Sequence, residues 1–273
     1  YNIFTALKEG KSMKHSKTII SLSLLCTVFS IFASGCSGKN TVHSIADLDG
    51  KTIGVQLDTV SDTYASDINN AEVKRYFDGS DAIKELLDGT LDAVIVDSDP
   101  ANVYVSENKG VKILDETFSE EQYAIAVKKG NTELEEKINN ALCELRDDGT
   151  LDALKENWTG KNAVKKPYDF QYHDAPTGGK LVMATSATFP PYEFISDDEV
   201  VGFDVDMMKA VCHKINMELV VIDTDFDLVL SDVVKGDTDV GVAGITVTDE
   251  RLKIVDFSDP YTTATQVVIV RKD

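Results

Sequence analysis

The sequence predicts an α/β protein made of two lobes of one design, each with a mainly parallel sheet flanked by helices. Short β-branched runs alternate with helix-like segments, and this alternation is typical of parallel sheets covered by helices on both faces. An internal repeat of one sequence pattern, the helix–strand repeat, supports two such lobes. The segment AIKELLDGTLDAVIVD, which begins at Ala82, is matched by LVLSDVVKGDTDVGVAG, which begins at Leu228. Each has an amphipathic helix, a Gly, two residues, an Asp and an apolar strand. A chain of 273 residues is long enough to bury a core in each lobe.

The first half of the chain shows the alternation most clearly. Asp58-Thr59 stops the first strand, Ser80 can cap the second helix, and Gly89 can end that helix. We expect strands at residues 51–56, 73–77, 93–96 and 122–127, and helices at residues 61–68 and 81–87.

The second half begins with helices. Residues 132–158 have apolar side chains at helical spacing and predict two helices broken at Asp148-Gly149. Residues 160–179 contain two Pro and a Gly pair without sustained periodicity, which indicates a linker. We expect a helix at 226–235 that ends at Gly236 and a strand at 239–242, which form the second copy of the helix–strand repeat.

Several motifs resemble a known family. GKLVMATSATFPPYEF, VVGFDVDMMKAV and AGITVTDERLKIVDFSDPY resemble the first lobe of the amino-acid-binding proteins of ABC importers. DLDGKTIGVQLDTVSDTYASD and GTLDAVIVDSDPANVYV, which come earlier in this chain, resemble the second lobe. The resemblance therefore implies a two-lobed periplasmic-binding-protein-like fold that is circularly permuted.

The resemblance also implies a division of the chain. Lobe two would span 44–130, helices at 131–158 would pack on lobe one, 159–179 would be the linker, and lobe one would span 180–273. We then expect one covalent hinge strand, near 127–131, and a C-terminal strand at 267–271 that ends close to residues 45–51. The alternative is a truncated tandem whose halves belong to different receptors.

The N-terminal segment resembles an export signal. A basic stretch from Met13 precedes the apolar run 18–32 and Ala33-Ser34-Gly35-Cys36, so we expect residues 13–35 to be a lipoprotein signal peptide and Cys36 to carry lipid. The alternative is a transmembrane anchor, but about 15 apolar residues fall short of the ~20 that a spanning helix needs. We expect residues 1–12 to be sequence that lies upstream of the true start at Met13 and is not part of the protein. We expect residues 36–43 to be a polar tether.

Charge and cysteine content limit the function classes. Cleavage before Cys36 would remove four Lys and one Glu and leave 23 basic against 46 acidic residues, a net charge of −23. Such a surface repels polyphosphate, so we expect no nucleic-acid partner. Cys143 and Cys212 are expected to be buried free thiols, with a disulfide between them as the alternative. No metal-ligand or phosphate-loop spacing is present, so no cofactor is expected.

The resemblance assigns the ends of an amino acid to charged residues. Arg251 matches the arginine that grips the α-carboxylate, with Thr246 and the backbone of Gly244 nearby; the alternative is a surface arginine paired with Asp249 or Glu250. The helix that opens at Thr59-Val60 offers free amides to the same carboxylate, unless Thr59 only caps the helix. Asp97 matches the carboxylate that pairs with the ammonium; the alternatives are a plain helix cap and Asp99 as the ammonium partner.

The remaining site residues concern the ligand side chain. Phe189 and Phe226 match aromatic residues that enclose it, and Ser186 and Gln56 match positions that reach its distal atoms. The Ser at position 186 favours a neutral or polar amino acid.

These matches predict a receptor rather than an enzyme. We expect a monomeric, lipid-anchored protein on the extracellular face of the cell membrane, which binds a free amino acid and delivers it to an ABC permease. A dehydratase of similar fold and a ligand-sensing domain are the rival functions.

Overall fold

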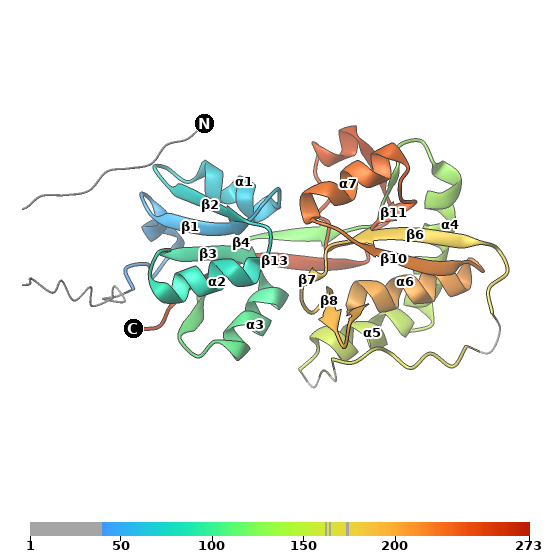
Figure 1. Ribbon diagram of the computed structural model, residues 1–273, viewed down its shortest axis with the longest axis horizontal. Coiled ribbons are helices and arrows are strands. Elements are labelled where there is room, and N and C mark those ends of the chain that lie inside the picture. Colours follow the sequence, from blue (N-terminus) through green and yellow to red (C-terminus); the bar gives the residue numbers. More distant parts are fainter. Residues whose placement is uncertain (1–39, 162, 164, 173–174) are drawn as a thin grey trace, which may run out of the picture. The chain divides into compact units, whose positions relative to one another are not determined.

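The computed structural model describes residues 40–161, 163, 165–172 and 175–273, which form two lobes, each built on a five-stranded sheet (Figure 1). The expected signal peptide and Cys36 lie outside these residues. Within these ranges, no helix has both the length and the apolar character needed to cross a membrane. The predicted α/β class with two sheet-containing lobes is confirmed.

Lobe two contains a sheet in which four strands run in one direction and one long strand runs opposite to them. The sheet has the order β2-β1-β3-β13-β4, in which β13 is antiparallel to both of its neighbours. Its strands are β1 Thr52–Gln56, β2 Glu72–Tyr76, β3 Ala93–Asp97, β4 Val111–Tyr123 and β13 Thr262–Arg271. Its helices are η1 Ile45–Leu48, α1 Val60–Asp67, α2 Gly79–Asp88 and α3 Ser98–Glu107.

Lobe one repeats this plan and adds a small sheet of three strands. Its main sheet has the order β10-β6-β11-β5-β12, with β10, β6 and β11 parallel. The main strands are β5 Ala126–Lys128, β6 Lys180–Thr185, β10 Glu218–Asp223, β11 Val240–Gly241 and β12 Val255–Phe257. The small sheet comprises β7 Thr188–Phe189, β8 Glu193–Ser196 and β9 Glu199–Val201. The helices are α4 Thr132–Asp147, α5 Thr150–Thr159, α6 Phe203–Lys214, α7 Phe226–Lys235 and η2 Arg251–Lys253.

Local sequence signals located most of the predicted helices. Helix α7 has the expected bounds and ends at Gly236, whose φ of 83° is the left-handed conformation that glycine adopts readily. The break between α4 and α5 also lies where Asp148-Gly149 predicted it. The expected cap at Ser80 is wrong: Asp78 is the N-cap of α2, and its side chain accepts from the N–H of Ser80 at 2.7 Å.

The chain crosses between the lobes twice, and this corrects the expected hinge. The predicted strand at 122–127 is broken: β4 ends at Tyr123 in the lobe-two sheet, and β5 begins at Ala126 in the lobe-one sheet. The second crossing leads from β12 to β13, which the expected division places in lobe one. A ten-residue strand spans about 33 Å, so β13 carries the chain well into lobe two. The expectation of a single covalent hinge strand near 127–131 is therefore wrong.

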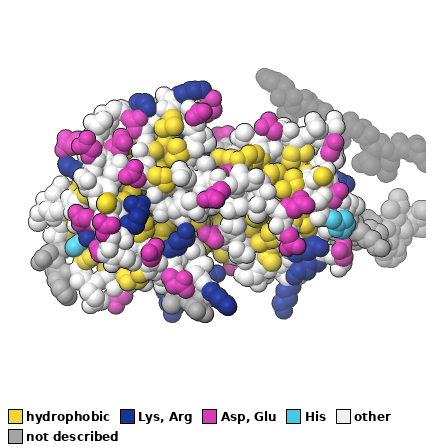
Figure 2. Space-filling view, turned by 180° about the vertical axis from the view of Figure 1, so that it is seen from behind, with side chains coloured by type: hydrophobic (Ala, Val, Ile, Leu, Met, Phe, Trp, Pro, Cys, Tyr) yellow, Lys and Arg dark blue, Asp and Glu magenta, His cyan; other side chains and the backbone are white. Residues whose placement is uncertain are grey.

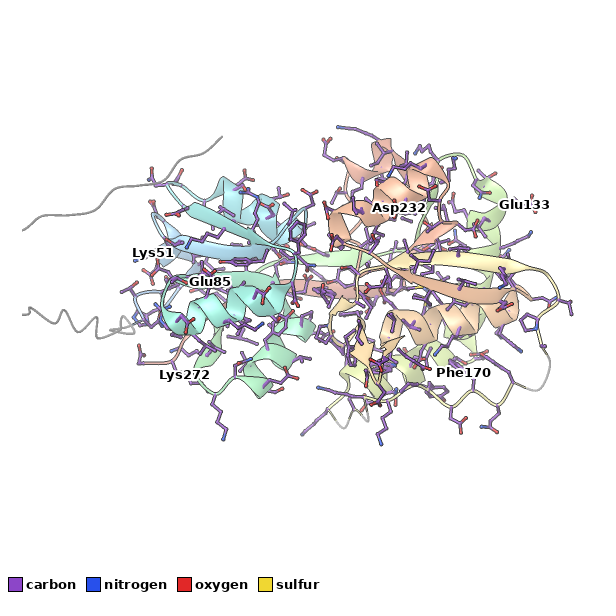
Figure 3. The ribbon with its side chains drawn as sticks, viewed as in Figure 1. Lys51, Glu85, Glu133, Phe170, Asp232 and Lys272 are labelled. Carbon is purple, nitrogen blue, oxygen red and sulfur yellow. The ribbon has the colours of Figure 1, made fainter. Side chains whose placement is uncertain are left out.

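The end of β13 lies beside the segment that precedes β1. Val268 and Val270 are fully buried in one cluster with Leu48 and Val42. The N–H of Lys272 donates to the carbonyl of Gly110 at 2.8 Å. Figure 3 accordingly labels Lys272 on the same lobe as Lys51. The expected proximity of residues 267–271 to residues 45–51 is present, but the buried Val42 does not fit a polar tether.

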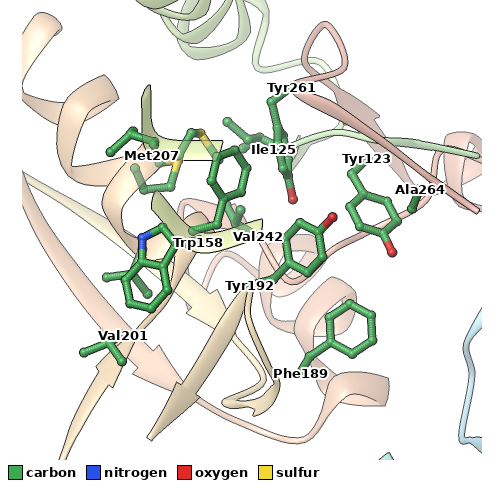
Figure 4. Packing of buried hydrophobic residues seen from close by; sticks show 14 of the residues in the cluster. Tyr123, Ile125, Trp158, Phe189, Tyr192, Val201, Met207, Val242, Tyr261 and Ala264 are labelled. Carbon is green, nitrogen blue, oxygen red and sulfur yellow. The ribbon is translucent and has the colours of Figure 1, made fainter. Parts of the chain in front are cut away.

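Large buried side chains fill lobe one between its helices and sheets (Figure 4). Trp158, on α5, donates to Asp206 of α6 at 2.9 Å and packs edge-on against Phe194 at 5.8 Å between ring centroids. These contacts hold the helices after β5 against lobe one. Cys212 is buried, but Cys143 is exposed, which corrects the expectation of two buried thiols; both are free. Acidic and basic side chains are interspersed over the face shown in Figure 2.

Candidate functional site

A small cavity of about 20 Å³ lies where the two lobes meet. Lobe two contributes the turn after β1 and the end of β3, lobe one contributes the loops around β7, α7 and η2, and β13 contributes Gln266. The lining residues are Gln56, Thr59, Val60, Asp97, Phe189, Phe226, Ala243, Gly244, Thr246, Arg251 and Gln266. All of the predicted ligand-binding residues except Ser186 therefore line one cavity.

Arg251 holds its guanidinium between the lobes. One Nη donates to the carbonyl of Thr246 at 2.9 Å, and the other donates to the carbonyl of Asp58, across the lobe boundary, at 3.0 Å. The guanidinium carbon lies 5.6 Å from the centroid of the Phe226 ring, which suits a cation–π contact. Because a guanidinium carries five N–H groups, three donors remain for an anion in the cavity.

Asp97 supplies the opposite charge at the end of β3. It is only 7% exposed, and its Oδ1 accepts from the Tyr123 hydroxyl at 2.5 Å and from the Gln266 amide at 2.7 Å. Burial raises the pKa of Asp97 to about 7, although these two hydrogen bonds partly oppose the shift. Both bonds go to Oδ1, so Oδ2 can accept from a cationic donor.

Glu121 is a second buried carboxylate beside the cavity, and the sequence reasoning missed it. It is 6% exposed, and its Oε2 accepts from the Thr246 hydroxyl at 2.7 Å and from the Gln266 amide at 3.3 Å. Its negative charge contributes to the raised pKa of Asp97. The period-2 pattern of a strand puts residue 121 on the same face as the buried Tyr123, and this signal could have identified it.

The turn after β1 uses the Thr59 side chain locally. The Thr59 hydroxyl donates to the carbonyl of Gln56 at 2.8 Å and accepts from the N–H of Asp62 at 3.2 Å, so it caps α1. Asp58 has a φ of 61°, which is the left-handed conformation that residues other than glycine adopt infrequently. The capping interpretation therefore holds for the Thr59 side chain, and only the main-chain amides at the start of α1 remain for a ligand.

The aromatic wall depends on a glycine. Gly244 has a φ of 55°, and a Cβ atom there would lie 2.8 Å from Phe189 Cε1 and 3.2 Å from Tyr123 Cε2. Phe189 can therefore pack closely against the loop that leads to Thr246. Ser186 is buried, its hydroxyl lies 3.4 Å from that of Thr188, and it does not line the cavity.

Two more contacts join the lobes around the cavity. The Tyr192 hydroxyl donates to Asp99 Oδ2 at 2.7 Å, and the Gln56 amide donates to the Thr188 hydroxyl at 3.3 Å. Asp99, which was the rival to Asp97, therefore contacts lobe one rather than the cavity. With the Arg251 contact to Asp58, these bonds hold the lobes together over a cavity little larger than one water molecule.

Two hinged lobes that enclose opposite charges and two aromatic rings define the class of two-lobed binding proteins. The chain belongs to the bacterial extracellular solute-binding proteins, family 3, whose model matches residues 35–161 and 181–273.

Curated relatives match parts of the chain. It is 42% identical over 94 residues to the arginine-binding extracellular protein ArtP of Bacillus subtilis (strain 168), a match that covers 34% of this chain and 37% of ArtP. It is 33% identical over 129 residues to the L-cystine-binding protein TcyJ of Escherichia coli (strain K12), which covers 46% of this chain and 48% of TcyJ. A solved structure, an ancestral arginine-binding protein bound to arginine, is 42% identical over 32% of this chain and 38% of its own, with a TM-score of 0.30. The chain thus spans less than half the length of each of these proteins.

Proposed function

We propose that this protein is a receptor that binds one free amino acid between its lobes. The observation that carries the proposal is the position of Arg251 and Asp97, which come from different lobes and line the same cavity. Arg251 and the amides at the start of α1 would take the α-carboxylate, and Asp97 Oδ2 would take the ammonium. Phe189 and Phe226 would enclose the side chain. The relatives named for arginine and cystine support an amino acid as the ligand class.

Ligand entry would require the lobes to separate. A cavity of about 20 Å³ cannot hold an amino acid, so the lobes must separate to admit the ligand and then close around it less tightly than in this structure. Closure then buries both charged ends of the ligand against their partners. Because the closed form binds the ligand more tightly than the open form does, binding shifts the population toward the closed form. The two crossings, near Ala124-Ile125 and between β12 and β13, would be the hinges.

The cellular setting is also part of the proposal. The motif that ends at Cys36 supports export and a lipid anchor, and the family is one of extracellular proteins. We propose that the monomeric, closed protein presents its ligand to the membrane subunits of an ABC permease, and that it performs no chemistry on the ligand.

We also propose that the two parts of the family's chain occur here in permuted order. The support is the lobe-two sheet, in which β13 lies between β3 and β4, although β13 follows the lobe-one motifs in the sequence. In a tandem of truncated receptors, β13 would instead pair with strands of a second chain.

A thermal-shift screen of the twenty amino acids, with cystine and ornithine added, tests the proposed function. A ligand that binds only the native state raises the unfolding temperature with its concentration. We expect one chemical class of amino acid to do so in the wild-type protein but not in Arg251→Ala, and calorimetry to show reversible binding without turnover. If no amino acid shifts the unfolding temperature, the proposal fails; if product forms, the protein is an enzyme.

A further inference from the structure

Lobe one contains a pair of buried carboxyl groups outside the cavity. Glu193 begins β8 and Asp204 lies in the first turn of α6, and both are 0% exposed. Asp204 Oδ2 accepts from the N–H of Gly244 at 2.9 Å and from the Tyr261 hydroxyl at 2.8 Å. Asp204 Oδ1 and both oxygens of Glu193 have no donor among the described residues. The Glu193 and Asp204 carboxyl groups lie within hydrogen-bonding reach of each other, so each has only the other as a partner for these three oxygens among the described residues.

Two ionised carboxylates in contact and out of water would repel strongly, and one of them must be neutral unless a cation lies nearby. Among the described residues, no Lys, Arg or His is within ion-pair distance of either group. The titratable groups that interact electrostatically with the pair are acidic or neutral: Tyr192, Tyr261, Asp223 at the end of β10 and Tyr104 on α3. A proton is then the simplest way to neutralise one charge.

The proton belongs on Glu193. Asp204 already accepts two hydrogen bonds and lies at the N-terminus of a 12-residue helix, where the helix dipole favours an anion. Burial raises the pKa of Asp204 to about 6, whereas burial and the neighbouring Asp204 raise the pKa of Glu193 well above its ordinary range.

We infer that Glu193 and Asp204 share one proton, carried by Glu193, and that the pair positions Gly244 in the cavity wall and Tyr261 at the start of the crossing strand β13. Asp204 Oδ2 joins the two residues through one atom. Gly244 precedes Thr246 in the loop that lines the cavity, and Tyr261 directly precedes β13. Loss of the proton would therefore disturb the cavity wall and a hinge together.

The direction of the pH effect follows from the raised pKa of Glu193. The stabilising effect of the proton on Glu193 is complete below the ordinary pKa of glutamate. It is lost as the pH rises toward the pKa of Glu193 in the folded protein, because the unfolded chain releases this proton at a lower pH. In Glu193→Gln the side-chain amide can donate to Asp204 Oδ1 at every pH. The variant should therefore keep the contact without titrating.

The first experiment compares unfolding temperatures of the full chain between pH 5 and pH 9. We expect Glu193→Gln to match the wild type at pH 5 and to unfold roughly 5 °C higher at pH 9. Glu199→Gln, a change at an exposed carboxyl on β9, is the matched control and should keep the wild-type pH slope. An unchanged slope in Glu193→Gln would overturn the inference.

The second experiment uses the wild-type chain, so it does not depend on a variant that folds. NMR of protein labelled with ¹³C at the glutamate carboxyls should show Glu193 protonated at pH 7, and the amide resonance of Gly244 should move with the same midpoint. A Glu193 carboxyl that ionises near its ordinary pKa would refute the shared proton, and a Gly244 amide that ignores the titration would refute the positioning role. Neither experiment needs a ligand, so both are independent of the proposed function.

Discussion

Tyr192, in lobe one, donates a hydrogen bond of 2.7 Å to Asp99, in lobe two. Neither residue lines the ligand cavity. The bond exists only when the lobes are together, so it stabilises the closed form and should contribute to affinity without touching the ligand.

Tyr192→Phe removes this bond and keeps the ring, which packs against Tyr123, Phe189 and Phe203. Loss of a hydrogen bond to a charged acceptor costs about 1.5 kcal/mol, so we expect an affinity about tenfold weaker by calorimetry. Asp99→Asn should weaken binding as well, and the double variant should be no worse than Tyr192→Phe alone. Additive losses would show that the two residues act separately.

Arg251→Ala should abolish binding of the amino acid that the thermal-shift screen identifies. A charge-assisted bidentate contact to a carboxylate contributes about 3 kcal/mol or more, which corresponds to roughly a hundredfold in affinity. The fold should survive, because Arg251 is partly exposed and its own hydrogen bonds go to main-chain carbonyls. Lys253→Ala, in the same short helix and paired with Glu250, is the control that should leave affinity unchanged. Affinity close to that of the wild type in Arg251→Ala would remove this residue from the site.

Asp97→Asn should distinguish an amino acid from its deaminated analogue. Only the amino acid presents an ammonium group, so its affinity should fall far more than that of the matching α-hydroxy acid. Calorimetry with both ligands measures this difference. Equal losses would mean that Asp97 does not contact the ammonium group.

Binding should also depend on pH through Asp97, whose pKa is raised to about 7 by burial and by Glu121. A protonated Asp97 cannot pair with an ammonium group, so affinity should be constant above pH 7 and fall by up to about tenfold for each pH unit below it. Asp97→Asn should remove this dependence. A wild-type affinity that stays constant from pH 5 to pH 8 would contradict the assignment.

The helices and the residues that line the cavity could be predicted from the sequence more accurately than the two crossings between the lobes. Helix α7 and its Gly236 end were predictable because amphipathic spacing and a left-handed glycine are local signals. The membership of β13 in lobe two was not predictable from such signals. The residues Thr262–Arg271 have the pattern of a strand that could belong to either lobe, and only their pairing with β3 and β4 decides between the two lobes. Glu121 was predictable only in part: its spacing of two residues from Tyr123 places it on the buried face of β4, but its hydrogen bonds with Thr246 and Gln266 join segments that are far apart in the sequence.

The proposed permutation makes a prediction about β13 that needs no ligand. Val270 is fully buried in a cluster with Leu48 and Ile53, so Val270→Ala should lower the free energy of unfolding by roughly 2 kcal/mol. If β13 completes the lobe-two sheet of its own molecule, the unfolding midpoint should not change with protein concentration, and Val270→Ala should be coupled to Leu48→Ala in a double-mutant cycle. Thr263→Ala, at an exposed position of the same strand, is the control and should change stability little. A midpoint that rises with protein concentration would instead indicate that β13 pairs with a second chain, as expected for a truncated tandem.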